Sequence, residues 1–456
     1  MTSRTTGVLL RSLRSRLYGT AAAKKEASES RKPLDKQGLK VTKLDNGLTV
    51  ASVEDYSPIS NVAVIIKAGA RYETTESLGV THALRVASTM STHGTTSINM
   101  VRSVQQTGAN IGCTATREYM IYSAEGLRDQ IPISIEAIRQ MTTGAAFKDH
   151  EWVDFIERLR FDVADSSVRP DIKLLEMLHE AAFRKGLGRS LYTTEHLVGN
   201  YYPDKLLNYM QKHYTQGRMA IVGTGIDHDQ LVSQAKHFLP YEPSGVKSEK
   251  SVYHGGEIRC ETGGSMAYAA VVTEGPSLSS KDLLAVGVLQ MIMGTGPHVK
   301  YSNDTAGSKL GHGVAEAVTN PFAISCINAN YTDSGLFGFY LLGHSSDMDK
   351  GLKAAFATFA KVTKLGVTDS EVTRGKNQLR AAIGMYLEDG NNRVMELGEQ
   401  IMGGENMVSF DDIVKMIDSI KPGDVTSAAK KVINGKPSMA AIGNLGNTPY
   451  LDEIMK

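Results

Sequence analysis

Two separate segments of this chain recur later in the sequence at one common offset. The segment DHEWVDFIERLR (149–160) aligns with DSEVTRGKNQLR (369–380), which lies 220 residues further on. At the same offset, RMAIVGTGID (218–227) is echoed by SMAAIGNLGN (438–447). Two independent matches with one offset are typical of an internal duplication. The chain is therefore expected to fold as two halves that repeat one architecture.

Each half reads as strands, a helix, paired strands and further helices. Expected strands cover residues 47–55, 61–70, 110–116 and 119–125 in the first half, and 267–275, 322–331 and 336–343 in the second. Expected helices cover residues 78–90, 128–143 and 150–164, then 280–294 and 348–388. Because strands and helices interleave without strict βαβ alternation, we expect an α+β fold. Each half should be a mostly antiparallel sheet packed with helices.

A polar segment between the halves is the expected linker. Residues 241–256 are rich in Pro, Gly, Ser and Lys, a composition that favours extended or flexible connections. The N-terminal domain is then expected to cover residues 38–240 and the C-terminal domain residues 257–456.

The first residues have the composition of a mitochondrial presequence. They are rich in arginine and hydroxyl residues, carry leucines at helical spacing, and contain no acid before Glu26. We expect a presequence over residues 1–18, with cleavage near Tyr18 and Gly19, followed by a polar lead-in over residues 19–37. The alternative interpretation is a disordered basic tail.

Charge, hydropathy and cysteine content exclude several classes of function. A formal net charge of +1 argues against general nucleic-acid binding, which needs a basic excess. No stretch reaches the about 18 to 20 consecutive apolar residues that a membrane-spanning helix requires. Cys113, Cys260 and Cys326 lie far apart with no CxxC pair, so they are expected to be inert thiols in a reducing compartment.

The segment GVTHALRVAS (79–88) looks like a zinc-binding helix that has lost half of its chemistry. Its expected core-facing side is formed by Val80, Ala83, Leu84 and Ala87. A zinc helix of this kind needs histidines at i and i+4 and a glutamate between them. Here His82 is followed at i+4 by Val86, which cannot bind a metal, and at i+3 by Arg85, a permanent cation.

This helix resembles the inverted-zincin helix, G-x-x-H-x-x-E-H, of the pitrilysin and mitochondrial processing peptidase family. On that resemblance the first ligand falls on His82, the catalytic glutamate on Arg85 and the second histidine on Val86. The family's third ligand, a glutamate, falls on Asp162, and Phe155 stands where active members keep another glutamate. The resemblance implies a pseudoenzyme with no catalytic residue, no bound metal and no cofactor.

A closer resemblance within the family is to the core subunits of mitochondrial ubiquinol–cytochrome c reductase, respiratory complex III. It rests on the HxxRV pattern and on MGTGPHVKYSND, YTDSGLFGFY and GNLGNTPYLDE. It implies a non-catalytic structural and assembly subunit, peripheral on the matrix side of the inner membrane. The implied partners are core protein 1, cytochrome b, the Rieske protein and other subunits of the complex. A cleaved presequence peptide held in the cavity between the core proteins is a further implied partner.

The α-subunit of the mitochondrial processing peptidase is the alternative that stays open. Its marker is a long glycine-rich loop, whereas residues 293–313 here have scattered glycines and a Pro-His-Val-Lys insert. Two shorter matches are expected to be chance. LHEAAF (178–183) begins like HExxH but ends in Phe183, and GTGPHVK (294–300) lacks the spacing of a phosphate loop.

Overall fold

The computed structural model describes residues 37–243, 245–246, 248–296, 307–404 and 407–454. The predicted presequence, with its cleavage positions Tyr18 and Gly19, lies outside the described residues. So does most of the 294–300 segment. The presequence, the linker and the domain boundaries therefore stay predictions.

The described strands form two sheets, one in each half, with matching topology. The strand orders are β1-β2-β6-β3-β5-β4 and β7-β11-β8-β10-β9. The first sheet comprises β1 (Lys40–Lys43), β2 (Thr49–Val53), β3 (Ile59–Ile66), β4 (Asn110–Ala115), β5 (Met120–Leu127) and β6 (Met219–Thr224). The second comprises β7 (Glu257–Glu261), β8 (Met266–Gly275), β9 (Phe322–Asn330), β10 (Gly335–His344) and β11 (Ser438–Gly443).

Apart from β1, each strand of the first sheet has a counterpart in the second. The strands β6 and β11 pair in parallel with β2 and β7, and antiparallel with β3 and β8. The remaining pairings within the two sheets are antiparallel. The predicted duplicated α+β fold is confirmed.

The helices repeat at the predicted offset. The first half carries α2 (Val80–Ala87), α3 (Ser97–Gln106), α4 (Ile131–Thr143), α5 (Asp149–Val168), α6 (Pro170–Phe183), α7 (Pro203–His213) and α8 (His228–Ala235). The second carries α9 (Leu283–Met293), α10 (Lys309–Ala315), α11 (Met348–Leu365), α12 (Asp369–Glu388), α13 (Gly390–Gly403), α14 (Phe410–Ser419), α15 (Pro422–Ile433) and α16 (Leu451–Ile454). The helices α5 and α12 have 20 residues each and begin 220 residues apart, as do the 14-residue helices α6 and α13. Among the described helices, none is long and apolar enough to span a membrane.

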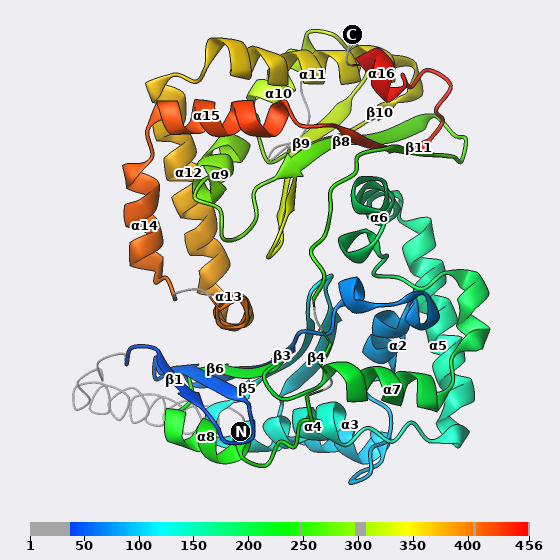
Figure 1. Cartoon of the computed structure of the whole chain (residues 1–456), viewed down its shortest axis with the longest axis vertical. Helices are drawn as coiled ribbons and strands as arrows, with labels where there is room; N and C mark the ends of the chain where they lie inside the picture. Colours follow the sequence, from blue (N-terminus) through cyan, green and yellow to red (C-terminus); the bar gives the residue numbers. More distant parts are fainter. Residues whose placement is uncertain (1–36, 244, 247, 297–306, 405–406, 455–456) are drawn as a thin grey trace, which may run out of the picture.

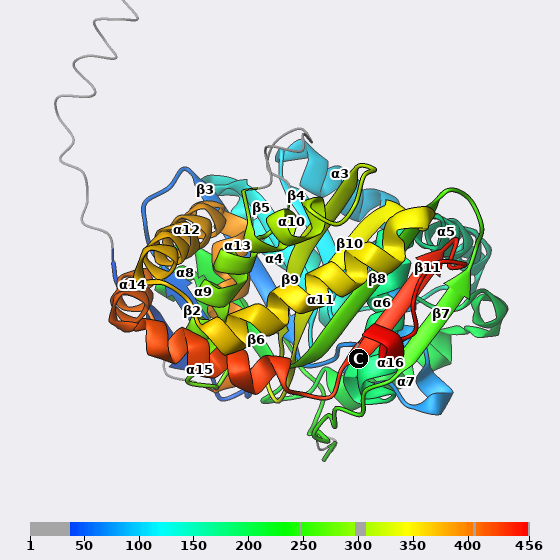
Figure 2. The same cartoon turned by 90° about the horizontal axis from the view of Figure 1, so that it is seen from above.

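The outer face of each sheet is covered by its own half's helices. In the first half, α2 buries its apolar side in the same core cluster as β3, β5 and α7. In the second half, the almost wholly apolar α9 is buried between its sheet and α12. Figure 2 shows α11 and α15 lying across the strands of this second sheet.

The inner faces of the sheets are covered by helices from the opposite half. The helix α6 leaves the first half and packs on β8 and β11, where Leu174, Leu178 and Phe183 form a core cluster with second-sheet residues. Conversely, α13 leaves the second half and packs on β3 and β6, where Val394 and Met402 join first-sheet residues. Figure 1 shows both crossing helices between the facing sheets. Each half therefore completes the core of the other.

A buried ion cluster also joins the two halves. Arg71 pairs with Glu118 of its own half and, at 2.6 Å, with Asp333 in the β9–β10 turn of the other. The backbone N–H of Thr332 donates to Glu118 (3.1 Å), and that of Ser251 donates to Asp333 (2.8 Å). Because these charges are largely buried and hydrogen-bonded, removing one would leave its partner unpaired.

Three elements differ from the sequence expectation. The expected strand 61–70 ends at Ile66, because the chain then crosses over the β4–β5 turn, where the N–H of Gly69 donates to the carbonyl of Glu118. The expected helix 78–90 covers only α2, which begins after Gly79 in the left-handed conformation at φ 71°. The strand β1 was not predicted because its side chains are mostly exposed, which leaves no alternating apolar pattern.

Candidate functional site

The N-terminus of α2 is held by one buried carboxylate. Glu73 accepts hydrogen bonds from the N–H groups of Gly79 (2.8 Å) and Thr81 (2.9 Å) and from the hydroxyl of Thr81 (2.7 Å). These donors are free because the first turn of a helix has no internal acceptors for them. Burial raises the pKa of Glu73 to about 7, although the three hydrogen bonds oppose this shift. The helix that carries His82 is thus anchored at its first turn.

His82 is fully buried and both of its ring nitrogens are occupied. The N–H of Thr193 donates to Nδ1 at 3.1 Å, so the proton lies on Nε2, which donates to Asp162 at 2.5 Å. The ring of Tyr192 packs edge-on against the imidazole at 5.4 Å between ring centroids. Burial holds the pKa of His82 below its usual range, and the nearby Arg85 cation acts in the same direction. His82 is therefore a neutral donor.

Arg85 and His82 converge on the same carboxylate oxygen. The Arg85 guanidinium donates to Oδ2 of Asp162, the atom that also accepts from His82. The hydrogen bond from His82 and the positive charge of Arg85 lower the pKa of Asp162. The ion pair is partly open to solvent, since Arg85 and Asp162 keep 30% and 36% of their side chains exposed.

The remaining positions of the lost zinc site are apolar. Val86 packs against the first-half core cluster, and Phe155 is fully buried in it. The ring of Trp152 lies 4.6 Å from that of Phe155, and its indole N–H donates to the carbonyl of Tyr201 at 3.1 Å. Trp152 thus anchors α5, as expected from the sequence.

This arrangement does not fit a catalytic metal ion. A zinc site needs three donor side chains around one open position. Here the cationic Arg85 contacts the carboxylate that would complete the ligand set, and Val86 offers no donor. Within the described ranges, no group of three or more His, Cys, Asp or Glu could hold a metal ion. The geometry brings His82, Arg85 and Asp162 together and turns Val86 into the core.

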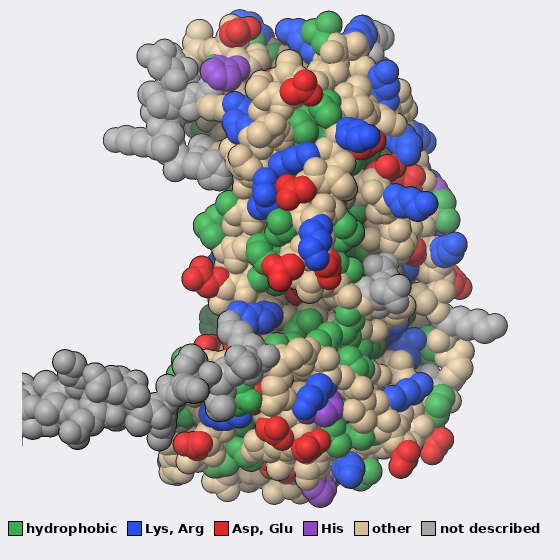
Figure 3. Space-filling model, turned by 90° about the vertical axis from the view of Figure 1, so that its left-hand side faces the viewer, with side chains coloured by type: hydrophobic (Ala, Val, Ile, Leu, Met, Phe, Trp, Pro, Cys, Tyr) green, Lys and Arg blue, Asp and Glu red, His purple; other side chains and the backbone are tan. Residues whose placement is uncertain are grey.

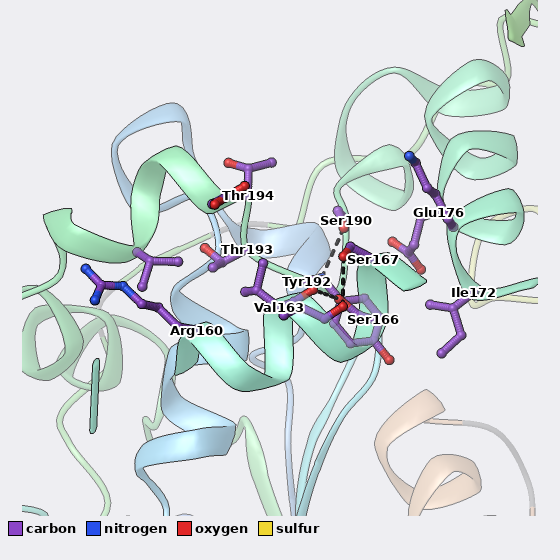
Figure 4. A pocket seen from close by; sticks show the side chains of 14 residues that line it. Arg160, Val163, Ser166, Ser167, Ile172, Glu176, Ser190, Tyr192, Thr193 and Thr194 are labelled. Atoms are coloured by element: carbon purple, nitrogen blue, oxygen red, sulfur yellow. Dashed lines mark hydrogen bonds between the residues drawn. The ribbon is translucent and has the colours of Figure 1, made fainter. Parts of the chain in front are cut away.

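A cavity of about 610 Å³ lies behind this cluster, between α5, the start of α6 and the 190–198 segment. Tyr192 and Thr193 separate it from His82, since they line the cavity and also contact the imidazole. In Figure 4, Val163 of α5 and Ile172 of α6 stand on opposite sides of it. Neither the cavity nor Glu73 was predicted, because no motif links these residues in the sequence.

Other residues singled out in the sequence have structural surroundings. His179, in the chance HExxH-like match, bonds the carbonyl of Leu175 and the hydroxyl of Tyr331, each at 2.7 Å. Cys113, Cys260 and Cys326 are free thiols. Burial raises the pKa of Cys113 to about 12 and keeps that of Cys326 well above its usual value, so neither forms the reactive thiolate readily.

Comparisons with known proteins cover nearly the whole chain. The family model "Insulinase (Peptidase family M16)" matches residues 49–195, and "Peptidase M16 inactive domain" matches residues 202–379. The human protein "Cytochrome b-c1 complex subunit 2, mitochondrial" is 37% identical over 96% of this chain and 98% of its own length. The mouse protein of that name is 36% identical over the same shares. The potato (Solanum tuberosum) "Mitochondrial-processing peptidase subunit alpha" is 28% identical over 91% of this chain and 84% of its own length.

Proposed function

The chain belongs to peptidase family M16, and from that premise we propose that it is a non-catalytic core subunit of mitochondrial complex III, in the position of core protein 2. It serves as a structural and assembly subunit of the ubiquinol–cytochrome c reductase. It contributes to the respiratory chain by building the complex, and it holds no cofactor.

The observation that carries this proposal is the place of Arg85. A peptidase of this family needs a base at that position to activate water, and a guanidinium cannot accept a proton at physiological pH. Its contact with Asp162 also neutralises the carboxylate that would complete a metal site. The fold is retained while its catalytic corner is closed by an ion pair, which is what a structural role requires.

The proposed location and partners follow from the relatives. The chain lies in mitochondria, peripheral to the inner membrane on the matrix side. It pairs with core protein 1 and neighbours cytochrome b and the Rieske protein. Figure 3 shows acidic and basic side chains interspersed over one face of the molecule, a surface suited to protein partners rather than to nucleic acid.

A pull-down of the tagged full chain from mitochondria in mild detergent tests the proposal. We expect cytochrome b and a second M16-family subunit to co-purify in stoichiometric amounts, with ubiquinol–cytochrome c reductase activity. Recovery of the chain from the soluble matrix with only an HxxEH-bearing partner, together with presequence cleavage, would overturn it.

Zinc content gives an independent test of the non-catalytic role. The purified chain should hold no stoichiometric zinc by atomic absorption and should cut no presequence peptide. The variant Arg85→Glu/Val86→His/Asp162→Glu restores the family's donor types and serves as the matched positive control. Stoichiometric zinc and cleavage in the unmodified chain would refute the pseudoenzyme interpretation.

The second candidate is the non-catalytic substrate-binding subunit of the mitochondrial processing peptidase. It is favoured by the similarity to the potato α-subunit over 91% of this chain. It is the weaker proposal, because that identity of 28% is lower than the 36–37% to the complex III subunits.

A cleaved presequence peptide, basic and amphipathic, is a proposed ligand of the cavity between the two core proteins. Asp162 would supply an anionic contact through the third of its side chain that stays exposed. Replacing Asp162 with lysine should reduce the amount of such a peptide retained by the purified complex, measured by mass spectrometry. Unchanged retention would count against this contact.

A further inference from the structure

Two neighbouring cavities meet at the corner between α5 and α6. The first is the cavity of about 610 Å³ beside the His82 cluster, and the second holds about 370 Å³ next to the β7–β8 turn. Ser167 and Lys173 line both cavities, so they mark the junction between them. The first cavity is lined by the first half alone. The second is lined partly by second-half residues, including Tyr268 and Ile442.

The charged residues of the lining leave one ammonium group without a carboxylate. Glu176 accepts from Arg117 at 2.7 Å and from the N–H of Leu191 at 2.9 Å, so its charge is already neutralised. Arg160 is paired with Glu157 at 2.7 Å. Lys173, in contrast, has no ion-pair partner within 4.0 Å among the described residues and is only partly exposed. A partly buried cation without a partner is costly, and an anion at the junction would offset that cost.

The remaining lining is apolar with a ring of hydroxyl groups. Val163, Ile172 and Val198 supply apolar surface in the larger cavity, and Figure 4 shows Ser166 and Ser190 there as well. Apolar side chains continue to the mouth of the smaller cavity, where Val168 and Met266 keep 80% and 39% of their surface exposed. Pockets of about 300 to 1,000 Å³ with mostly apolar walls and a few convergent polar groups are typical of small-molecule sites.

We propose that these joined cavities bind a single-chain amphiphile with one negative charge, of the long-chain carboxylate class. The carboxylate lies on the Lys173 ammonium and the Ser167 hydroxyl, and the hydrocarbon chain fills the larger cavity along Val163 and Ile172. A single free ammonium matches one negative charge, whereas a phosphate monoester would call for a second cation or a bidentate arginine. Because the walls come from both halves, the ligand also stabilises their relative placement.

Photo-crosslinking in the intact assembly tests the proposal directly. Detergent-solubilised mitochondrial complexes that contain the tagged full chain are irradiated with a diazirine-bearing palmitate, and the labelled peptides are mapped by mass spectrometry. We expect labelling within residues 160–173 and 190–198, competed by oleate and not by oleyl alcohol, which lacks the charge. Label elsewhere on the chain, or equal competition by the alcohol, would overturn the proposal.

Matched variants separate the charge from the cavity. Lys173→Gln should lower labelling about tenfold, the effect of losing one charge-assisted hydrogen bond, whereas Lys173→Arg should retain it. Lys185→Gln, an exposed lysine outside the lining, is the control and should not change labelling. Ala164→Phe, which fills the larger cavity and keeps Lys173, should also abolish labelling. Undiminished labelling in both Lys173→Gln and Ala164→Phe would exclude this site.

Discussion

The two crossing helices solve one packing problem in opposite ways. On α13 the residue facing the sheet is Gly398, and an added Cβ would collide with Ile65 of β3. At the position 220 residues earlier, α6 carries the fully buried Leu178, and the strand residue that corresponds to Ile65 is Ala270 of β8. A large strand residue meets a small helix residue in one half, and the reverse holds in the other. The duplication preserves the total volume of the contact while the individual side chains change, as close-packed cores require.

The corners behind the sheets differ in polarity rather than in size. In the first half, α2 meets α5 through His82, Arg85 and Asp162. In the second half, α9 meets α12 through apolar contacts, with Gly287 against Leu379 and Gly375 against Ile292. The residue of α12 that corresponds to Asp162 is an alanine. The same frame is stable with an apolar corner, so the fold does not require the polar cluster of the first half.

The largest expected effect comes from giving α13 the large residue of α6. Gly398→Leu should lower the free energy of unfolding by about 3 kcal/mol, because the new side chain forces α13 away from the first sheet. The double variant Ile65→Ala/Gly398→Leu reproduces the arrangement of the other half and should recover most of this loss. Urea unfolding followed by circular dichroism measures both.

The matched control for this substitution is Gly423→Leu in α15, where an added Cβ meets no atom within 4 Å. It should leave the stability unchanged or slightly higher, since leucine favours the helix more than glycine does. If the double variant were no more stable than Gly398→Leu alone, the exchange of volumes between the halves would not explain the difference.

The second test makes the polar corner resemble the apolar one. Asp162→Ala should cost about 2 kcal/mol, because it leaves the buried Nε2–H of His82 without an acceptor. Adding His82→Leu to this variant removes the orphaned donor and should restore about half of the loss. Equal stability of the single and double variants would show that the orphaned donor is not the source of the cost.

The third test concerns the titratable residue that each crossing helix carries at equivalent positions, His179 on α6 and Glu399 on α13. Burial, together with the charges of Glu396 and Glu118, raises the pKa of Glu399 to about 7 from 4.5. The stabilising contribution of its neutral form is therefore fully present below pH 4.5 and is lost as the pH rises through about 7. We expect a loss of about 1.5 kcal/mol across this range, less than the full shift implies because the group is partly exposed.

Glu399→Gln should remove this pH dependence, whereas the exposed Glu388→Gln on α12 should retain it. Urea midpoints measured between pH 4.5 and 8.5 give the comparison. A pH profile of Glu399→Gln that follows the unmodified chain would rule out Glu399 as the responsible group.

The smallest expected effect is at the N-terminus of α2. Glu73→Gln should cost about 1 kcal/mol, because an amide oxygen is a weaker acceptor for the three donors than a carboxylate is. Glu76→Gln, in the preceding turn and not bonded to α2, is the control. Similar losses in both variants would argue against a capping role for Glu73.

Much of the architecture could be predicted because it depends on local patterns. The common offset predicted two halves, and the apolar spacing in 79–88 predicted the buried side of α2. The loss of a base and a ligand at Arg85 and Val86 was also visible in the sequence. The identity of Glu73 as the cap of α2 was not, because its contacts span a loop with no capping motif at the helix start.

The sequence by itself determined the duplication, the sheet-forming segments and the absence of a complete zinc motif, since each is recorded in residue types at short or regular spacing. Only the tertiary structure decided that α6 and α13 exchange halves. It alone brought Asp162 to His82 and Arg85, and it alone joined two cavities at Lys173. These features depend on side chains that are far apart in the chain and meet only after packing, where volume and charge are balanced between partners and not along the sequence.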